Sequence, residues 1–361
     1  MDYSESERWS LDPWVDDSSP SEPAFVLTVK RDLNYSLIMA TKERWLITGG
    51  AGYIGSHIAD LFLANGREIV IYDSLSHGLK SRVDYLAKKH GVEIPLVIAD
   101  IRDTESFEET IEIFLPQGII HTAAVKAVAE SIENPDKYFD INSDATSRIL
   151  EVAKSKFVKN FIFSSTAAVY GSPAKSSQVK ESDFLLPSSP YGLSKVKAEE
   201  KVNEFLDSKN HKGTSLRFFN VVGTASLALL DNSVDNLLPI VINKLKSGEQ
   251  PVVFGSDYPT QDGTCIRDFV DVRDVAEAHF MAALNLNSLP LAFNVGTGRG
   301  RSVNEVIDVA RRAIGRTDID SKKEGRRLGD VAELTADVTL IQSVLGFRAK
   351  YCLEESIVSM I

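Results

Sequence analysis

The sequence contains little cysteine, no long apolar run and no excess of basic residues. Only two cysteines, Cys265 and Cys352, occur among its 361 residues, and neither has a partner at the spacing of metal ligands. We therefore expect no disulfide framework and no metal site, and the pattern fits a cytoplasmic protein. No apolar stretch is long enough to span a membrane. The formal net charge of −11 argues against nucleic-acid binding, which needs a basic face.

The rest of the composition is typical of a globular protein, with 43% hydrophobic and 25% charged residues. The length allows one large domain or two ordinary ones. The first 22 residues differ, because they hold seven acidic residues against one basic residue, together with many serines and prolines. Such a composition is typical of a solvated tail. We expect residues 1–40 to be disordered or dispensable, with Met39 as a candidate true start.

Short apolar runs alternate with helical patterns from Trp45 onward, and the runs predict buried parallel strands. This alternation predicts an α/β fold with a doubly wound parallel sheet over residues 41–220. After residue 221 strands and helices no longer alternate regularly, and the predicted elements are smaller and mixed. We therefore expect residues 221–361 to form mainly a second, smaller lobe that is interleaved with the first domain. The predicted strands are residues 45–48, 68–73, 96–100, 118–123, 160–166 and 215–221.

A glycine-rich turn, "TGGAGYIGSH", follows the first predicted strand and opens the first helix. Its Gly49, Gly52 and Gly55 allow the backbone to approach a pyrophosphate, and the helix N-terminus offers free N–H groups. Asp73 ends the second strand about 20 residues further on, where a carboxylate can hold ribose hydroxyls. The combination predicts a dinucleotide site. A carboxylate would repel a 2′-phosphate, so Asp73 favours NAD over NADP.

The stretch "SPYGLSK" (189–195) places Tyr191 and Lys195 one helical turn apart. Ser189 is a good N-cap and Pro190 a good first helical residue, so the helix should begin there. A free tyrosine has a pKa of about 10, and we expect Lys195 and a nicotinamide cation to lower that of Tyr191. Thr166, at the end of an upstream strand, could bond the substrate oxygen that Tyr191 deprotonates. These residues predict a proton shuttle.

From about Trp45 to Leu353 the sequence resembles the extended short-chain dehydrogenase/reductases, and most closely the UDP-glucose 4-epimerases. The resemblance is carried by "TGGAGYIGSHIA", "DIRD", "KAVAESIENPDKYF", "KNFIFSSTAAVYG", "SPYGLSK", "RFFNVVG", "NLLP", "VFGSDYPTQDGTCIRDFVDVRDVAEAH" and "FNVGTG". It implies a Rossmann-type fold and a tightly held NAD that is not consumed. It also implies that Tyr191 takes the proton from the sugar's 4-hydroxyl while hydride passes to NAD. The keto sugar then turns over, and hydride returns to its opposite face.

The resemblance also implies the residues around each ligand. Lys195 would contact the nicotinamide ribose, and Thr166 stands where the family has a serine or threonine. The positions that match the family's cofactor site are Gly49, Gly52, Tyr53, Ile54, Gly55, Asp73, Ser74, Asp100, Ile101, Thr122, Ala123, Ala124, Lys126 and Phe219. Those that match its UDP site are Asn220, Asn236, Leu237, Phe254, Arg267, Arg327 and Asp330. A homodimer through the helices around residues 143–156 and 192–206 is likewise implied.

Three other functions compete with 4-epimerisation of UDP-glucose. Sugar-nucleotide 4,6-dehydratases of the same fold place an Asp-Glu pair directly after the strand-end threonine, where this chain has Ala167 and Ala168. A different UDP-sugar, such as an N-acetylhexosamine or a pentose, stays open because Leu334 stands near the position where the family has a pocket-restricting tyrosine. The third alternative is a non-catalytic nucleotide-sensing protein, which would not need a proton shuttle. Ile141 departs from an asparagine that many relatives place near the cofactor, although Asn142 follows.

Overall fold

The computed structural model describes residues 43–172, 178–208, 210–233, 236–327 and 329–361. The predictions for residues 1–40 lie outside this part of the chain and stay predictions. The predicted domain boundary near residue 220 also stays a prediction. Most strands before that position lie in one sheet, and most strands after it lie in two other sheets.

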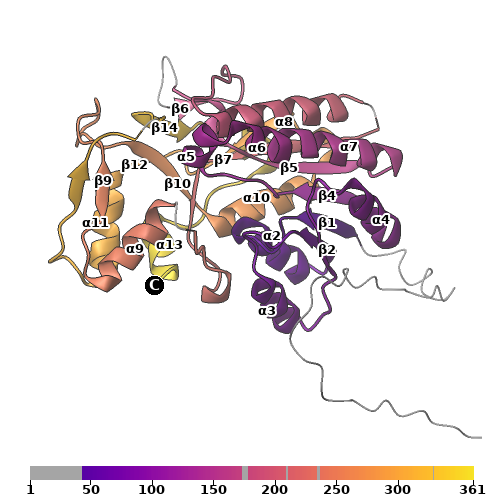
Figure 1. Cartoon of the computed structure of the whole chain (residues 1–361), viewed down its shortest axis with the longest axis horizontal. Helices are drawn as coiled ribbons and strands as arrows, with labels where there is room; N and C mark the ends of the chain where they lie inside the picture. Colours follow the sequence, from indigo (N-terminus) through magenta and orange to yellow (C-terminus); the bar gives the residue numbers. More distant parts are fainter. Residues whose placement is uncertain (1–42, 173–177, 209, 234–235, 328) are drawn as a thin grey trace, which may run out of the picture. The chain divides into compact units, whose positions relative to one another are not determined.

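A seven-stranded sheet forms the first layer of the fold, with every neighbouring pair of strands parallel. The strand order is β11-β7-β5-β4-β1-β2-β3, which doubles back around β1 as a doubly wound sheet requires (Figure 1). The doubly wound parallel sheet predicted from the sequence is therefore confirmed. The strands are β1 (Arg44–Thr48), β2 (Glu68–Asp73), β3 (Leu96–Ile98), β4 (Gly118–His121), β5 (Asn160–Thr166), β7 (Lys212–Phe218) and β11 (Ala292–Val295).

Three strand predictions need correction. The run predicted as residues 118–123 ends at His121. The run predicted as residues 96–100 ends at Ile98, because the Asp100 carboxylate accepts a hydrogen bond from the backbone N–H of Arg102 at 2.9 Å and bends the chain into a turn. The run predicted as residues 215–221 is split between two sheets, since β7 ends at Phe218 and Asn220 begins β8 on a second sheet.

Helices cover both faces of the main sheet because its strands alternate apolar side chains between two cores (Figure 1). Leu46 packs into the core under α4, α7 and α8, whereas Ile47 packs into the core under α2, α3 and α10. The helices are α2 (Tyr53–Ala64), α3 (Lys80–His90), α4 (Thr104–Phe114), α5 (Val128–Glu133), α6 (Pro135–Tyr138), α7 (Ala145–Ser155), α8 (Pro190–Leu206) and α10 (Val272–Leu284), with 3-10 turns at Ala167–Val169, Leu227–Leu229 and Leu286–Ser288.

A second group of elements packs around its own core, which includes Leu238, Val253 and Ile307. Its larger sheet has the order β12-β10-β14-β6, with β8 also paired to β10, and a small sheet pairs β13 with β9. The strands are β6 (Gln178–Val179), β8 (Asn220–Val222), β9 (Val252–Phe254), β10 (Ile266–Asp271), β12 (Gly300–Ser302), β13 (Lys322–Glu324) and β14 (Glu333–Ala336), and the helices are α9 (Leu237–Ser247), α11 (Val303–Ile314) and α13 (Leu353–Ser359). The remaining helix, α12 (Thr339–Leu345), packs on the main-sheet core that also holds Ile47.

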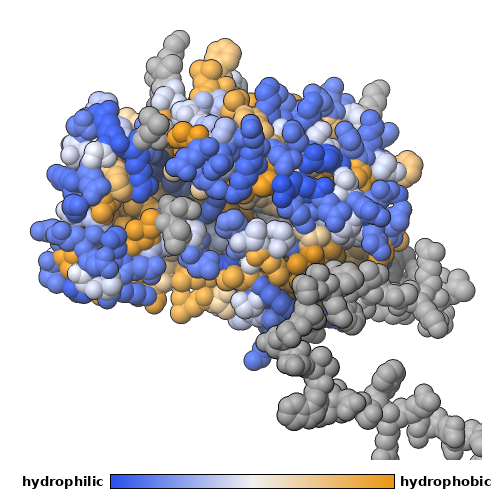
Figure 2. Space-filling view, viewed as in Figure 1, coloured by the Kyte–Doolittle hydropathy of each residue, from blue (hydrophilic) through white to orange (hydrophobic). Residues whose placement is uncertain are grey.

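The two groups of elements are interleaved along the chain. β10 belongs to the second sheet, but α10 follows it directly and packs on the main sheet, and β11 then pairs with β7 at the edge of that sheet. Hydrophilic residues cover most of the face shown in Figure 2, with apolar residues gathered in smaller groups. None of the helices in the described residues is long and apolar enough to cross a membrane.

Candidate active site

The glycine-rich turn between β1 and α2 needs its glycines for two different reasons. Gly49 has a φ of +68°, and a Cβ there would lie 2.7 Å from the backbone nitrogen of Ala123. A Cβ on Gly55 would lie 2.2 Å from the carbonyl oxygen of Gly49, so this position lets the helix pack onto the turn. Both positions therefore exclude side chains, as the fingerprint predicts.

The N-terminus of α2 has no side chain that competes with a bound anion. Gly52 is its N-cap, no side chain caps the helix and no acidic residue lies in its first turn. A Cβ on Gly52 would meet a single atom of the described residues within 4 Å, the carbonyl oxygen of Gly49, so the space beyond Gly52 is open. Free N–H groups and the helix dipole together favour a phosphate in such a place. A dinucleotide pyrophosphate fits this cradle.

The Asp73 carboxylate lies at the end of β2, beside the same turn. Its two oxygens accept hydrogen bonds from the backbone N–H groups of Ala51 (2.9 Å) and Leu75 (2.8 Å), which fix its orientation. Burial raises the pKa of Asp73, and these two bonds oppose that shift. The nearby Arg82 is not available for a 2′-phosphate, because its guanidinium donates to the carbonyl oxygens of Ala51 and Leu230. This arrangement fits the ribose hydroxyls of NAD.

The other predicted cofactor residues divide into two groups. The loop after β4 lies beside the glycine turn, because the Thr122 hydroxyl donates to the carbonyl oxygen of Thr48 at 2.6 Å. Ala123, Ala124 and the exposed Lys126 follow on this loop, while Ser74 is exposed directly after Asp73. The remaining side chains have protein partners: Tyr53 donates to Gly223, Asp100 pairs with Arg102, Ile101 and Phe219 are buried, and Ile54 packs on the core.

Tyr191 and Lys195 lie on α8, which begins at Pro190 as predicted. The Ser189 hydroxyl accepts a hydrogen bond from the backbone N–H of Gly192 at 3.1 Å and so caps the helix. Lys195 is 3% exposed, donates to the carbonyl oxygen of Ser164 at 2.7 Å and lies 4.1 Å above the centre of the Phe163 ring. Thr166 lies at the end of the same strand, β5, and its hydroxyl hydrogen-bonds to Tyr191. The structure thus brings Tyr191, Lys195 and Thr166 together at one strand end.

The expected lowering of the Tyr191 pKa is wrong for the protein groups alone. Burial raises the pKa of the Tyr191 phenol, and only the hydrogen bond with Thr166 opposes that shift. Lys195 does not contribute to the shift of the Tyr191 pKa, and burial lowers the pKa of Lys195 itself to about 7, against an opposing contribution from Glu199. The error arises because desolvation disfavours the charged form of both groups, and burial is not visible in a helical spacing.

Asn142 is a site residue that the sequence analysis left without a role. It lies in a π-helix, Phe139–Asp144, and is 1% exposed. Its amide exchanges two hydrogen bonds of 2.9 Å with the backbone of Val125 and donates to the Ser194 hydroxyl at 3.0 Å. Ile141 instead packs partly buried on the core. Asn142 therefore ties the loop carrying Lys126 to the helix carrying Tyr191. The only hint of this role in the sequence was that Asn142 directly follows Ile141, where many relatives have an asparagine.

Two further side chains support α8 from within the protein. The ring of the buried Tyr138 packs edge-on against that of Tyr191, with 6.3 Å between the centroids. Glu199, one turn beyond Lys195, forms a buried ion pair with Arg217 at 2.6 Å and accepts a hydrogen bond from Ser165. Neither the packing nor the ion pair can be read from local sequence, because Tyr138 and Arg217 are distant from α8 along the chain.

The predicted UDP-site residues occupy the second group of elements. Arg267 on β10 lies 3.4 Å from the Asp330 carboxylate, and the Arg327 guanidinium lies 3.8 Å above the centre of the Phe254 ring. Asn236 occupies the N-cap position of α9 without a capping bond from its side chain, which instead donates to Asp231 at 2.5 Å, whereas Asn220 is exposed on β8. Arg267 does not pair with the adjacent Asp268, which binds the 297–298 backbone, or with Asp271, which binds Arg273.

One hydrogen bond connects the two halves of the site. The Ser188 hydroxyl donates to the carbonyl oxygen of Gly329 at 3.3 Å. Gly329 lies between Arg327 and Asp330, and Ser188 lies three residues before Tyr191. The loop of the predicted UDP site is therefore in contact with the segment that leads into the proton-shuttle helix.

Comparisons with known proteins agree with this geometry. The model of the NAD dependent epimerase/dehydratase family matches residues 45–296. A UDP-glucose 4-epimerase of Halalkalibacterium halodurans is 36% identical over 312 residues, which cover 85% of this chain and 90% of that protein. The crystal structure of UDP-glucose 4-epimerase from Bifidobacterium longum in complex with NAD+ and UDP has a TM-score of 0.82 and 32% identity, covering 88% of this chain and 96% of that chain. The UDP-Glc/GlcNAc 4-epimerase of Campylobacter jejuni has a TM-score of 0.77 and 36% identity, covering 88% and 98%.

Proposed function

This chain belongs to the NAD dependent epimerase/dehydratase family, and from that premise we propose that it is a UDP-glucose 4-epimerase that interconverts UDP-galactose and UDP-glucose. The observation that carries the proposal is the cluster of Tyr191, Thr166 and Lys195 at the end of β5, on the same sheet as the glycine turn and Asp73. A proton shuttle beside a dinucleotide cradle is what reversible oxidation of a sugar hydroxyl requires.

The residues of the cradle fit NAD. The open N-terminus of α2 would hold the pyrophosphate, and Asp73 would hold the adenosine ribose. The bound cofactor supplies a hydride acceptor for the sugar's C4 and a positive charge near the phenol. Lys195 is held against Ser164 and would donate to the nicotinamide ribose with its remaining N–H groups.

Tyr191 carries the proton chemistry in this proposal. Its oxygen takes the proton of the 4-hydroxyl as C4 is oxidised to the ketone, and it returns that proton after the sugar has turned over. Thr166 is the side chain that hydrogen-bonds to the Tyr191 phenol, and it would keep the phenol aligned with the sugar's 4-hydroxyl. Because burial raises the pKa of Tyr191, the protein groups by themselves favour the neutral phenol. The ionised form therefore has to be stabilised by positive charge in the working complex.

Anchoring of UDP leaves the hexose free to turn. Arg267 and Arg327 bring two guanidinium groups to one loop region, and a planar fork of donors suits a diphosphate. We assign the UDP contacts to these arginines together with Asp330, Phe254, Asn220, Asn236 and Leu237.

Elimination is disfavoured at this site. A 4,6-dehydratase needs an acid and a base at the positions of Ala167 and Ala168, which here form a short 3-10 turn directly after Thr166. Neither methyl group can donate or accept a proton. The cluster therefore supports epimerisation over dehydration, and the intact shuttle argues against a purely nucleotide-sensing protein.

A second substrate class, a UDP-N-acetylhexosamine, is favoured by one observation. Leu334 on β14 lies in register with Arg267 and packs in a buried cluster with Ala167 and Phe219. A leucine at the family's tyrosine position would leave more room beside the sugar. Incubation of the purified protein with UDP-galactose, UDP-GlcNAc and UDP-xylose separately, followed by product analysis, tests the proposal. Conversion of none of these sugars would refute an epimerase function.

We also infer a cytoplasmic homodimer that associates through α7 and α8. These two helices pack side by side on one face of the main sheet, and Leu193 on α8 is 40% exposed. The mass measured by light scattering should be twice that of the 39.7 kDa chain. A monomeric mass at micromolar concentration would contradict the inferred dimer.

A further inference from the structure

A cavity of about 300 Å³ lies in the second group of elements, away from the candidate active site. Its walls come from the loop after β11, the start of β12 and the segment from α12 to α13. None of Tyr191, Lys195, Arg267 and Arg327 lines it. The cavity is thus separate from every residue to which the proposed function assigns a role.

The polar lining of the cavity is cationic. Arg299, Arg301, Arg348 and Lys350 line it together with Thr297, Gln342 and Tyr351, and the lining contains no aspartate or glutamate. Lys350 has a partner, since it lies 2.6 Å from Glu277. Within the part of the chain that the structure describes, Arg299, Arg301 and Arg348 form no ion pair. Arg299 and Arg348 are exposed at the mouth of the cavity and Arg301 is half-buried, so the cavity presents three guanidinium groups that have no carboxylate partner among the described residues.

The position of Arg301 adds an independent argument. It lies directly opposite Arg267 in the antiparallel pairing of β12 with β10. Like charges in directly opposite positions repel each other. Arg267 is compensated by Asp330 at 3.4 Å, but no carboxylate of the described residues compensates Arg301. An anion in the cavity would supply the missing charge.

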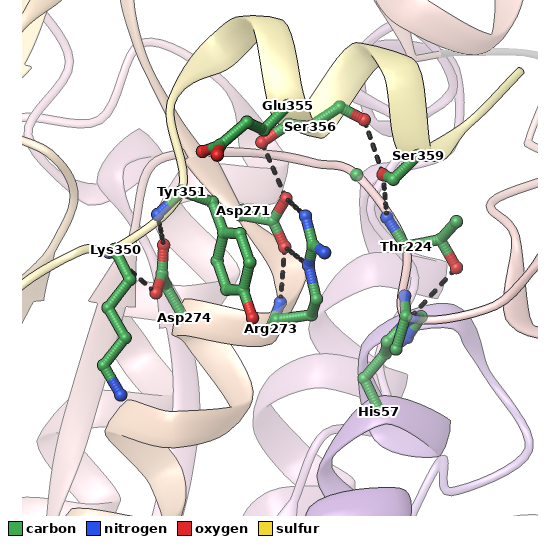
Figure 3. Close-up of polar contacts among 12 residues, drawn as sticks. His57, Thr224, Asp271, Arg273, Asp274, Lys350, Tyr351, Glu355, Ser356 and Ser359 are labelled. Atoms are coloured by element: carbon green, nitrogen blue, oxygen red, sulfur yellow. Dashed lines mark hydrogen bonds and ion pairs between the residues drawn. The ribbon is translucent and has the colours of Figure 1, made fainter.

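The walls of the cavity are held in place by other contacts (Figure 3). Asp274 accepts hydrogen bonds from the backbone N–H groups of Lys350 (3.0 Å) and Tyr351 (3.3 Å), which fixes the segment that carries Arg348. The Arg273 guanidinium lies 3.5 Å above the centre of the Tyr351 ring and is itself bound by Asp271. These contacts fix the backbone of one wall of the cavity, so this wall need not be ordered when a ligand binds.

We propose that this cavity binds a small phosphate ester carrying at least two negative charges. Arginine forks match the geometry of phosphate oxygens, and Thr297 and Gln342 add neutral hydrogen-bonding groups. The volume is at the lower end of the range for small-molecule sites. Part of the lining is apolar, from Phe269, Val338, Phe347 and Leu353, and this suits the carbon skeleton of an ester.

Calorimetric titration with fructose 1,6-bisphosphate tests the proposal on the full chain. NAD and UDP are kept at saturating concentrations, so that they prevent the probe from binding at the candidate active site. We expect saturable one-to-one binding that is weakened at least tenfold by Arg301→Ala and by Arg348→Ala. Arg348 is exposed, so its replacement tests the site even if Arg301→Ala fails to fold.

One matched variant serves as the control. Arg312→Ala removes the same charge from an exposed position on α11 outside the cavity. Probe binding should change less than twofold in this variant. No binding by the unaltered protein, or equal weakening by Arg312→Ala, would overturn the proposal. Citrate binding as tightly as the probe would overturn the assignment to phosphate. UDP-sugar turnover is measured separately, so a failure of the proposed epimerase function can be distinguished from a failure of the phosphate-ester proposal.

Discussion

The ammonium group of Lys195 donates a hydrogen bond of 2.7 Å to the main-chain carbonyl oxygen of Ser164. This contact fixes Lys195 beneath the end of β5, one helical turn from Tyr191 and two residues along the strand from Thr166. The lysine is therefore part of a fixed scaffold around the phenol. Burial lowers the pKa of Lys195 to about 7, and the neighbouring Glu199 opposes that shift.

Tyr191→Phe should lower the epimerisation rate by about 10²–10⁴-fold, because general acid–base catalysis contributes about that much. The glycine cradle is untouched, so NAD should stay bound. The rate with UDP-galactose and the cofactor content of the purified variant check this. Tyr85→Phe, a change of the same atoms at a partly buried tyrosine on α3, should leave the rate unchanged. Near-normal turnover by Tyr191→Phe would remove the phenol from the mechanism.

Gly55→Ala should abolish cofactor binding or reduce it severely, because its Cβ would lie 2.2 Å from the carbonyl oxygen of Gly49 and would force the turn apart. The NAD content of the purified variant measures this effect. Gly325→Ala is the matched control, since a Cβ there meets no described atom within 4 Å. Full NAD occupancy in Gly55→Ala would show that the turn does not hold the cofactor.

Glu199→Gln should destabilise the fold by about 3–5 kcal/mol, because it leaves the Arg217 guanidinium buried without its carboxylate. Urea unfolding at neutral pH gives this value. Glu200→Gln removes an exposed partner of Lys197 and should cost less than about 1 kcal/mol. Equal losses of unfolding free energy in the two variants would mean that the buried ion pair contributes no more to stability than the exposed one.

Arg267→Ala should weaken UDP binding at least tenfold, because the arginine is assigned to the diphosphate. Titration of UDP into the NAD-bound variant measures the dissociation constant. The exposed Arg312→Ala change, which removes the same charge from α11, should leave it unaltered. Unchanged UDP affinity in Arg267→Ala would exclude the residue from the substrate site.

Three buried histidines should remove stability as the pH is lowered from about 6.5 toward 4, and Asp274, whose pKa burial raises to about 6, opposes part of this loss below pH 6. Burial lowers the pKa of His57 to about 4, of His121 to about 3 and of His279 to about 4, from the ordinary value of 6.5. In this window the unfolded chain binds protons that the folded chain does not, so each histidine removes about 1.4 kcal/mol per pH unit. These contributions are fully present above pH 6.5.

Urea unfolding at pH 7 and pH 5 measures this loss. His279→Asn should reduce the pH slope, whereas His77→Asn, at an exposed loop position, controls for removal of a histidine. An unchanged difference between the two pH values in His279→Asn, relative to the unaltered protein, would contradict the account of these buried imidazoles.

Features with a local cause could be predicted from the sequence. Six strands of the main sheet, the glycine turn and the start of α8 follow from apolar runs, backbone freedom and capping by Ser189. Features with a tertiary cause could not. β11 joins the main sheet from a distant part of the chain, and the π-helix that aims Asn142 has no local signature. The pKa of Tyr191 follows from burial, which a spacing of four residues does not reveal.

The most direct test of the proposed mechanism follows the hydrogen on C4. UDP-galactose deuterated at C4 is incubated with the purified protein in ordinary water, without added NAD, and the UDP-glucose formed is analysed by NMR. The account predicts that the product keeps its deuterium at C4, because the bound cofactor returns the hydride it received. UDP-glucose carrying solvent hydrogen at C4, or no UDP-glucose even after NAD is supplied, would contradict it.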